Sequence, residues 1–448
     1  MKRWLAALII GPLAAHADDK AELQDALAAA QLKSPLREDL QRPVDPRLSL
    51  IETKGFFKGA AHTVHNTAEV RALSGKLKPG DQLVLATGEW KDARLTFGAT
   101  GTQEAPILIR PETPGSATFT GASEVAFFGS HLIITDLEFR EVSVTAKSAV
   151  IFRLGNGKAK PADHSIVDRI RFTNCGSPKP EDWPRLQLWL MNVLGPDNTV
   201  ANCTFAGMKH LGQMLGAGDL PPEGLQHLHI LNNRFSDRPK IDEQNGYEII
   251  QIGWSGEKAR SSGSLIEGNT FENCNGETEI ITLKASDVFV RHNTFTACQG
   301  ALVLRHGDRV LVQDNVFDGK GAPSTGGVRL CGADHVIIGN IFRNFTKPHD
   351  YYYRTISVMA ASAERTADDM EGYGRAQNVL ISGNRFEHND TRIAAGIYPR
   401  PNYPLLPRNI WVRDNVFTGT TATSAFDYKA PDPKGEMALI EDGNKFEP

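Results

Sequence analysis

The chain has 448 residues, of which 40% are hydrophobic and 8% aromatic, with 41 glycines and a formal net charge of −4. This composition is typical of a soluble globular protein that is somewhat rich in turns. A mildly acidic chain has no general attraction for polyanions, so we expect no nucleic acid partner. Any acidic polymer must bind at a local basic patch.

The N-terminal segment MKRWLAALIIGPLAAHADDK has the order of a secretory signal: two basic residues, an apolar run from Trp4 to Ala15, and small residues up to Ala17. We predict a signal peptide over residues 1–17, because the apolar run is shorter than the roughly 20 residues that span a bilayer. The alternative is an N-terminal membrane anchor. No later segment is apolar enough to span a bilayer, so we expect an exported protein, periplasmic or secreted, without stable membrane insertion.

Residues 18–58 are rich in Ala and Leu at helical spacing and then bear prolines. They predict an N-terminal helical extension and a connector, which we expect to cap one end of the domain that follows. After Thr67 the sequence predicts a second short helix, a Pro-Gly-Asp turn and an apolar strand.

Five cysteines are scattered along the chain: Cys175, Cys203, Cys274, Cys298 and Cys331. An odd, sparse set argues against a disulfide scaffold even in an exported protein. Three of them follow an equivalent Phe by three residues, which favours buried thiols. One disulfide, or use in metal binding or catalysis, remain the alternatives.

An internal repeat organises the rest of the chain, in which short apolar segments such as IEGNTF, VRHNTF and VQDNVF recur. The closing phenylalanines are Phe139, Phe172, Phe205, Phe235, Phe271, Phe295, Phe317, Phe342, Phe386, Phe417 and Phe446. The shortest spacings, 22 to 25 residues, define the bare unit, and longer spacings indicate insertions.

A unit of this length with short strands and an Asn at a fixed turn position predicts one coil of a right-handed parallel β-helix. The Asn is expected to adopt the left-handed conformation and to bond its counterparts in adjacent coils. We therefore predict an all-β solenoid over residues 59–448 as the catalytic domain. Propellers need longer repeats, and leucine-rich repeats need a Leu frame that the sequence lacks.

Four cations recur at about one coil: Lys284, Arg305, Arg329 and Arg354 are separated by 21, 24 and 25 residues. In a solenoid, such spacing predicts a vertical column about 4.8 Å from coil to coil. Like charges at that distance need an anionic partner, so the column predicts a groove for a linear polyanion, most naturally an acidic polysaccharide. The alternative is a solvated face in chance register.

Glu277 and Glu279 precede Lys284 in the stretch NCNGETEIITLK, and Asn245 lies about one enlarged coil earlier. Carboxylates at i and i+2 point to one face of a strand, and with an amide oxygen they form a hard-oxygen cluster suited to Ca²⁺. Salt bridges to the neighbouring cations are the alternative. Because Lys284 has the opposite parity, the chain must bend or bulge between Glu279 and Lys284 if both face one groove.

The segments NGYEIIQIG, NGETEIITLK, LVLRHG and GGVRLCG, together with GTQEAPILIRPETPG upstream, resemble polysaccharide lyase family six, the alginate lyase and chondroitinase B group. The similarity covers roughly residues 67–446. It implies a right-handed parallel β-helix and β-elimination of a 4-linked uronate polymer.

Matched position by position, the resemblance implies roles for seven residues. It implies Lys284 as general base and Arg305 as proton donor; Asn245, Glu277 and Glu279 as Ca²⁺ ligands; and His306 and Arg329 as substrate contacts. Arg354, from the column of cations, and Gln251 are added as candidate substrate contacts. Gln251 is a departure, because this family often has Arg there. The substrate contact at that position is therefore in doubt.

Two other classes of function stay open at this point. A β-helical glycoside hydrolase would need an acid and a base carboxylate that flank the scissile bond, hence at least one carboxylate beyond Glu277 and Glu279. A non-catalytic carbohydrate-binding protein would need no base. Among lyase substrates, alginate is expected first and dermatan sulfate, as for chondroitinase B, second; the sequence leaves the oligomeric state open.

Overall fold

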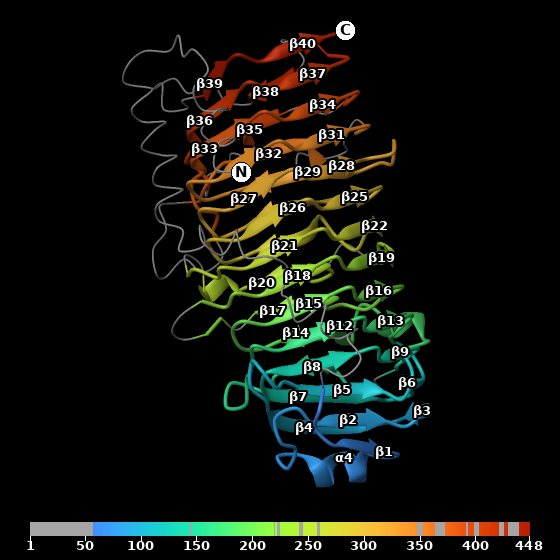
Figure 1. Ribbon diagram of the computed structural model, residues 1–448. Coiled ribbons are helices and arrows are strands. Elements are labelled where there is room, and N and C mark those ends of the chain that lie inside the picture. The colour runs from blue at the N-terminus through green and yellow to red at the C-terminus, as the bar shows by residue number, and fades with distance from the viewer. Residues whose placement is uncertain are drawn as a thin grey trace.

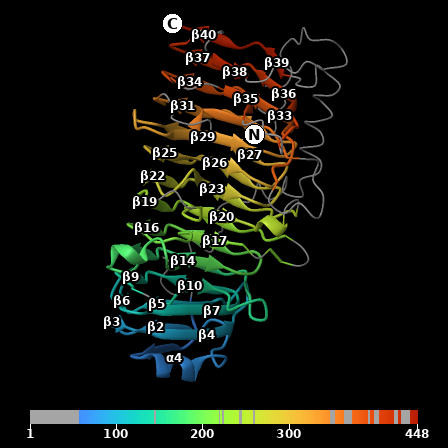
Figure 2. The same cartoon turned by 180° about the vertical axis from the view of Figure 1, so that it is seen from behind.

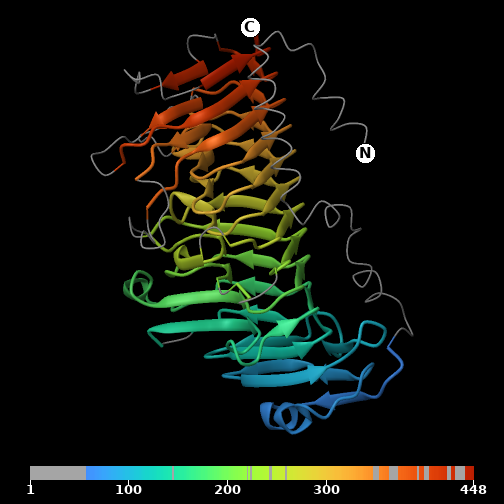
Figure 3. The same cartoon turned by 90° about the vertical axis from the view of Figure 1, so that its left-hand side faces the viewer.

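The structure is a computed structural model of the chain. It describes residues 57–448 except 144–145, 219, 222–224, 242–244, 258–259, 347–352, 363–371, 391–392, 398–402, 421–424 and 429–438. The predicted signal peptide and all but the last two residues of the predicted extension over 18–58 lie outside these residues. The described chain is a stack of coils that rises from α4 at one end to β40 at the other (Figures 1 and 3).

Three parallel sheets run the length of the stack, and most coils contribute one strand to each of them. Sheet A contains β1 (Ala61–Val64), β2 (Gln82–Leu85), β5 (Ile107–Pro111), β8 (Leu132–Thr135), β12 (Ile166–Asp168), β15 (Thr199–Ala201), β18 (His229–Leu231), β21 (Leu265–Glu267), β24 (Phe289–Arg291), β27 (Leu311–Gln313), β30 (Val336–Ile338), β33 (Gln377–Ser382), β36 (Arg408–Arg413) and β39 (Leu439–Asp442). Sheet B contains β3 (Gly88–Lys91), β6 (Ala117–Thr120), β9 (Glu138–Arg140), β13 (Arg171–Thr173), β16 (Thr204–Ala206), β19 (Arg234–Arg238), β22 (Thr270–Cys274), β25 (Thr294–Thr296), β28 (Val316–Asp318), β31 (Ile341–Arg343), β34 (Arg385–Glu387), β37 (Val416–Thr418) and β40 (Lys445–Glu447).

Sheet C forms the face on which Figure 2 shows β14, β17, β20, β23, β26 and β29 one above another. It contains β4 (Arg94–Thr100), β7 (Glu124–Ser130), β10 (Ser148–Leu154), β11 (Ala162–Asp163), β14 (Gln187–Val193), β17 (Leu215–Ala217), β20 (Ile250–Ile252), β23 (Glu279–Leu283), β26 (Gly300–Leu304), β29 (Thr325–Leu330), β32 (Ile356–Met359), β35 (Ile393–Ile397) and β38 (Phe426–Tyr428). The predicted right-handed parallel β-helix is confirmed.

The repeat phenylalanines form a continuous stack inside the solenoid, on sheet B. From Phe119 to Phe446, consecutive rings lie 4.6–5.2 Å apart between centroids and within 16° of parallel. The stack begins one coil earlier than the sequence repeat indicated, at Phe119. Offset stacking of buried rings adds to the apolar burial that stabilises each coil against the next.

A ladder of buried asparagines marks the turn between sheets A and B. The Oδ1 of Asn293 accepts the backbone N–H and the side-chain N–H of Asn269 at 2.9 Å each, and Asn293 in turn donates to Asn315. The same pattern links Asn233, Asn269, Asn293, Asn315, Asn340, Asn384, Asn415 and Asn444. The predicted bonding between coils is confirmed.

The conformation predicted for these asparagines is wrong. The left-handed residue is the one before each ladder Asn, for example Asn232 with φ 54° and His292 with φ 55°. The ladder position instead needs an amide that can both donate and accept inside the solenoid, which explains why Asn is chosen there. The residue before it only has to tolerate positive φ.

One end of the solenoid is covered by the helix α4 (Thr67–Leu73), which lies beneath β1 and β4 in Figures 1 and 2. Asn66 caps this helix by accepting the N–H of Glu69 at 3.0 Å, and Val70 is buried. The predicted short helix is confirmed. Two further short helices are 3-10 turns, η3 (Pro180–Asp182) and η4 (Ser255–Glu257). Within the described residues, no helix combines the length and apolar character needed to traverse a bilayer.

All five cysteines are buried free thiols, so the structure contains none of the disulfides left open above. Cys175, Cys274 and Cys298 occupy equivalent positions, where each thiol donates to the carbonyl of the repeat Phe one coil earlier at 3.4–3.5 Å. Burial raises the pKa of the Cys175 thiol to about 12. These cysteines are core residues, as expected.

Candidate active site

Lys284 and Arg305 lie side by side at the C-terminal end of sheet C. Leu283 pairs with Leu304, and the backbone N–H of Arg305 donates to the carbonyl of Leu283 at 2.9 Å, so the two cations sit at the same level on adjacent coils. Both side chains are half-buried. The predicted neighbourhood of these two residues is confirmed.

The predicted column of four cations is wrong beyond this pair. Arg329 pairs with Val303, a step of 26 residues, so the residue level with Arg305 is Cys331. A register shift between Gly300 and Leu302 gives β29 one additional residue, and this shift displaces Arg329 along the strand. A count of residues from coil to coil cannot reveal such a bulge.

Arg354 is also displaced from the column. It precedes β32, and its carbonyl accepts the N–H of Gly327 at 3.1 Å. Its guanidinium pairs with Asp427 on β38 at 3.3 Å. Arg354 therefore binds a carboxylate two coils further along the stack than its own strand.

A β-bulge in β23 solves the parity problem of the stretch NCNGETEIITLK. The register shifts between Glu279 and Ile281, and both Ile280 and Ile281 belong to the core. One additional residue thus turns Glu279 outward, on the same face as Lys284. The predicted bulge is confirmed.

Glu279 is the electrostatic centre of the site. Its carboxylate, 9% exposed, pairs with the buried guanidinium of Arg329 two coils away and lies 4.0 Å from Nε of Arg305. Burial disfavours the charged carboxylate, but Arg329 and Arg305 outweigh it and lower the pKa of Glu279. The salt-bridge alternative is thus observed for Glu279, which holds two of the predicted cations in place.

Glu277 faces the loop that carries Asn245. Its Oε1 accepts the N–H groups of Gly246 and Tyr247 at 3.2 and 3.1 Å, next to Asn245, which is exposed. Burial raises the pKa of Glu277 well above its usual range, and the nearby carboxylates of Glu248 and Glu279 raise it further. Around Glu277, the negative charge of the carboxylates therefore exceeds the positive charge that the neighbouring residues supply.

Glu248 is a site residue that the sequence reasoning missed. It is 2% exposed, and its Oε2 accepts the amide of Gln213 at 2.8 Å. Its pKa is raised by burial first and by Glu279 second. Its place in NGYE, three residues after Asn245, was the available signal, but a single Glu before an apolar strand does not distinguish an outward site residue from a surface charge.

Gln251 is buried, and both ends of its amide are bonded within the fold. Its Oε1 accepts from Gln213 at 3.1 Å, and its Nε2 donates to the carbonyl of Gly253 at 3.0 Å. The indole N–H of Trp189 donates to the other side of Gln213. A neutral amide network thus occupies the position at which an Arg was expected from the resemblance.

Arg238 is the buried cation beneath the carboxylates. It is fully buried on β19, donates to the carbonyls of His210 and Gly212 at 2.8 and 2.7 Å, and lies over the ring of Tyr247 at 5.4 Å. Burial lowers the pKa of Arg238 to about 10, while Glu248 and Glu277 oppose that shift. It supplies part of the positive charge that lets this acidic cluster exist inside the fold.

A loop wall, built from two insertions between the coils, lies over Arg305. The guanidinium of Arg305 stacks 4.0 Å from the ring centre of Tyr373, which contacts the ring of Tyr403 at 5.3 Å. Arg375 ties the two insertions together through the carbonyl of Leu406 at 2.7 Å. Tyr373 was not singled out as a site residue, because nothing in a long insertion indicates which Tyr folds back.

His306 follows Arg305 and is buried, with its N–H donated to the carbonyl of Leu283 at 3.1 Å. It lies directly after the half-buried Arg305, at the corner where the chain leaves sheet C. Its predicted contact with substrate stays a prediction.

The donor set fits a hard cation. Two carboxylates, Glu277 and Glu279, and the loop of Asn245 present oxygen ligands, and the raised pKa of Glu277 reflects a charge excess that a cation would relieve. Among the described residues, no three His, Cys, Asp or Glu side chains converge into a compact metal-binding group. The prediction that Asn245, Glu277 and Glu279 hold Ca²⁺ stays a prediction.

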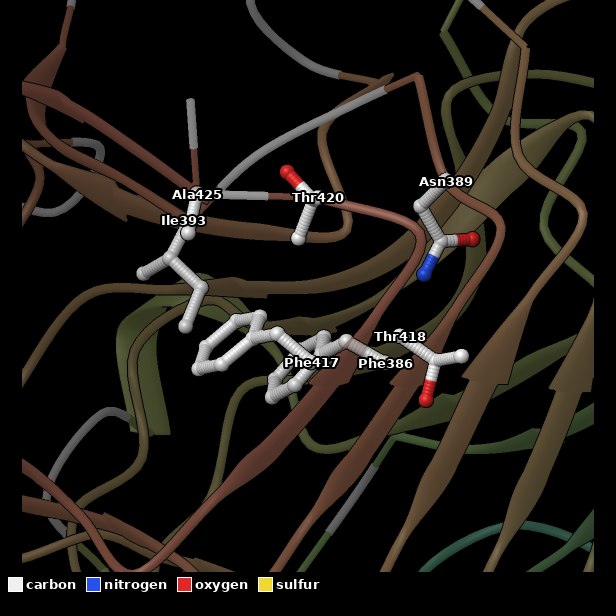
Figure 4. Close-up of a pocket in the computed structure, with 7 residues that line it drawn as sticks. All are labelled: Phe386, Asn389, Ile393, Phe417, Thr418, Thr420 and Ala425. Carbon is white, nitrogen blue, oxygen red and sulfur yellow. The ribbon is translucent and has the colours of Figure 1, made fainter. Parts of the chain in front are cut away.

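A small pocket elsewhere has different chemistry. It lies between the last coils and is lined by Phe386, Asn389, Ile393, Phe417, Thr418, Thr420 and Ala425. Figure 4 shows the two phenylalanine rings of the core stack along its floor and only the Asn389 amide and threonine hydroxyls as polar groups. With no acid or base among its lining residues, this pocket is a packing gap and not part of the site.

Comparisons with known proteins agree with this geometry. The chain is similar to the alginate lyase AlyGC of polysaccharide lyase family 6, with a TM-score of 0.78 and 27% identity over 86% of this chain and 51% of AlyGC. The chain therefore spans about half the length of AlyGC. It is also similar to a mannuronic acid specific family 6 lyase from human gut microbiota, with a TM-score of 0.76 and 26% identity over 87% of each chain.

A family 6 lyase from Pseudopedobacter saltans shares the fold, with a TM-score of 0.74 and 20% identity over 86% of this chain and 92% of that one. A search of curated proteins finds no match. The sequence matches the chondroitinase B family over residues 64–399, three quarters of the chain. The resemblance to polysaccharide lyase family 6 is confirmed, and the chain belongs to the chondroitinase B family.

Proposed function

We propose that this protein is a polysaccharide lyase that cleaves a 4-linked uronate polymer by β-elimination, with alginate as its substrate. The observation that carries the proposal is the adjacency of Lys284 and Arg305 on neighbouring coils, beside the buried pair of Glu279 and Arg329. An amine next to fixed cations is what removal of a proton beside a carboxylate requires.

In the proposed reaction, unprotonated Lys284 takes the C5 proton of a uronate, and the electron pair forms a C4–C5 double bond as the C4–O bond breaks. Arg305 is held over Tyr373 and near Glu279, and these contacts support a role for its guanidinium at the departing oxygen. It would donate a proton to that oxygen. Arg329 holds Glu279 in place, and the Glu279 carboxylate interacts with both Lys284, the proposed base, and Arg305, the proposed donor.

We further propose that Asn245, Glu277 and Glu279 hold Ca²⁺. When bound, a hard cation neutralises the substrate carboxylate and so makes the C5 proton more acidic. Glu279 would then serve two functions, as a ligand and as the partner of Arg329 and Arg305. Glu277, which accepts hydrogen bonds from two backbone N–H groups, would gain a cation in addition to the nearby Arg238.

Alginate is proposed over dermatan sulfate because similar structures include an alginate lyase at 27% identity and a mannuronic acid specific lyase at 26% identity to this chain. The family name, chondroitinase B, supports the second candidate and makes it the comparison substrate. We also propose that the protein is exported. A long uronate polysaccharide is encountered outside the cytoplasm, and the segment 1–17 has the order of a signal peptide.

The test is a lyase assay on mannuronate-rich alginate, guluronate-rich alginate and dermatan sulfate, followed by the ultraviolet absorbance of the unsaturated product. We expect turnover on alginate and a loss of about 10²–10⁴-fold in Lys284→Ala, the usual contribution of a general base. Lys91→Ala, an exposed lysine on β3, is the matched control and keeps full activity.

A parallel assay with a chelator tests the metal. We expect activity to fall on chelation and to return with added Ca²⁺, and Glu277→Gln to need more Ca²⁺ for half activation. Depolymerisation without absorbance would instead indicate hydrolysis, and no product from any polymer would contradict the lyase assignment. Full activity of Lys284→Ala would remove Lys284 from the mechanism.

A further inference from the structure

Trp254 stands out among the described residues as the one large apolar side chain that is exposed, with 40% of its surface accessible. It follows β20 in the segment QIGWSG, at the corner where the chain leaves sheet C. Single exposed hydrophobic residues are normal on protein surfaces. Its position relative to Lys284 and the packing of its ring are what make it informative.

Backbone hydrogen bonds place Trp254 next to the candidate base. The N–H of Lys284 donates to the carbonyl of Ile252 at 2.8 Å, and the N–H of Gly253 donates to the carbonyl of Ala217 at 2.9 Å. Gly218, Gly253, Lys284 and Arg305 therefore occupy one level on four consecutive coils. Two glycines thus precede the candidate base, and Gly218 lies roughly 10 Å from Lys284 at the usual strand spacing.

The indole of Trp254 lies against Gly218, on the coil before its own. A Cβ at position 218 would overlap Cε2 and Nε1 of the indole, and Gly218 does not have positive φ. Glycine is therefore required at 218 for space and not for backbone conformation. The ring is held by this close approach, which leaves part of its surface to solvent.

The outward positions of sheet C on the two coils before Lys284 carry neutral residues, unlike the coils after it, which carry Arg305 and Arg329. Gly216 and Gln251 occupy paired outward positions on β17 and β20, and the Gln251 amide is engaged with Gln213 and with the carbonyl of Gly253. The bond to Gly253 also fixes the backbone next to Trp254. The site thus has a neutral half on the coils before Lys284 and a cationic half, with Arg305 and Arg329, on the coils after it.

We propose that Trp254 is a stacking platform for the pyranose ring of a sugar residue bound on the N-terminal side of Lys284. One face of a pyranose consists of C–H bonds, which suits the negative face of an indole and needs no charge on the protein. The carboxylate of the sugar at the scissile bond is left to the cationic half. The proposal rests on the proposed function, since it extends the same polymer across the Lys284 coil.

The experiment compares wild type, Trp254→Phe and Trp254→Ala on uronate oligosaccharides of increasing length, with kcat and KM measured separately. We expect Trp254→Ala to lose about tenfold in kcat/KM, mainly through KM, on oligosaccharides long enough to reach the indole. The shortest cleaved substrate should be unaffected. Trp254→Phe, which keeps a ring, should stay within about threefold of wild type.

Gly218→Ala is the second variant, because a methyl group there must displace the indole. It should reproduce the loss of Trp254→Ala on long substrates, and combining the two substitutions should add little. A thermal unfolding curve for each variant checks that the fold persists.

Equal kinetics of Trp254→Ala and wild type at every length would overturn the proposal. A kcat loss of the same size at all lengths would also overturn it, since that result assigns Trp254 to the placement of Lys284. If wild type cleaved no uronate polymer, the proposed function would be wrong. Titration calorimetry with the same oligosaccharides would then decide the proposal: weaker binding by Trp254→Ala than by wild type and Trp254→Phe would support stacking, and equal affinity of all three or an absence of binding would overturn it.

Discussion

The corner between sheets A and B repeats itself from coil to coil, whereas the C-terminal end of sheet C carries different residues along the stack. At the first corner, each ladder asparagine bonds the next one, and the phenylalanine stack runs beside it. At the end of sheet C, glycine, lysine and arginine follow one another, and Glu279 reaches a guanidinium two coils away.

The difference separates two ways of satisfying buried polar groups. In the ladder, identical amides satisfy each other, so the solution can be repeated without limit. At the site, opposite charges must be matched one by one, and any missing partner leaves a buried charge. The repeated amides stabilise the solenoid, whereas the charged residues that do not repeat form the candidate active site.

The largest loss of stability is expected when the buried ion pair between Glu279 and Arg329 is broken. Arg329→Met removes the cation that contacts the buried carboxylate of Glu279 and leaves the next guanidinium, that of Arg305, 4.0 Å away; it should cost about 3–5 kcal/mol in urea unfolding. Both samples should contain chelator, so that bound metal does not mask the loss. The matched control is Arg94→Met in β4, whose exposed pair with Glu124 at 2.7 Å should contribute less than about 1 kcal/mol. Equal losses for the two variants would remove the contrast between buried and exposed pairs.

A cut in the middle of the ladder should cost somewhat less. Asn293→Ala removes the partners of Asn269, Asn315 and the carbonyl of Ile266, and we expect a loss of about 2–3 kcal/mol in the free energy of unfolding. Asn444→Ala, at the half-buried end of the ladder, has one ladder neighbour and should lose less than about 1 kcal/mol. If the end position mattered as much as the middle, the ladder bonds would not act coil by coil.

The smallest effect is a pH dependence on sheet B. Burial disfavours the Asp318 carboxylate, but hydrogen bonds from Asn344, Lys320 and Arg343 prevail and lower its pKa from 3.8 to about 2. A lowered pKa stabilises the fold above the unfolded value, and this stability is lost as pH falls from about 4 to about 2.

Asp318→Asn should therefore flatten the fall in unfolding temperature between pH 4 and pH 2, with little change below it. Glu104→Gln, at an exposed position, is the control and should leave the profile unchanged. A wild-type slope retained in Asp318→Asn would assign the acid sensitivity to other carboxylates.

The fold could be predicted from the sequence because its determinants recur: Phe and Asn return once per coil, and each return is an independent indication of the same unit. The pair of Lys284 and Arg305 was predictable for a similar reason. The bulge in β23 precedes Lys284, so it does not change the number of residues between Lys284 and Arg305. Arg329 was not, because one inserted residue in β29 shifts a register that counting assumes to be constant. Arg354 was not either, because the long insertion before β32 leaves it three residues short of Ser357, which pairs with Arg329.

The roles of Glu248 and Tyr373 depended on contacts between distant segments. Glu248 becomes a site residue only through Gln213, 35 residues earlier, and Tyr373 only through an insertion that folds back over Arg305. Neither contact recurs from coil to coil. Pairing of side chains across irregular loops is decided by packing, which a single sequence does not display.

The core stack has a consequence for how such a protein changes over generations. Phe295 and Phe317 are 22 residues apart and Phe342 and Phe386 are 44 apart, yet the ring centres lie 4.6 and 5.1 Å from each other. The surplus chain leaves through the corners on either side of β32 without disturbing the frame. Loop length and coil geometry can therefore evolve independently, so new walls can be acquired over an old groove while the scaffold is inherited intact.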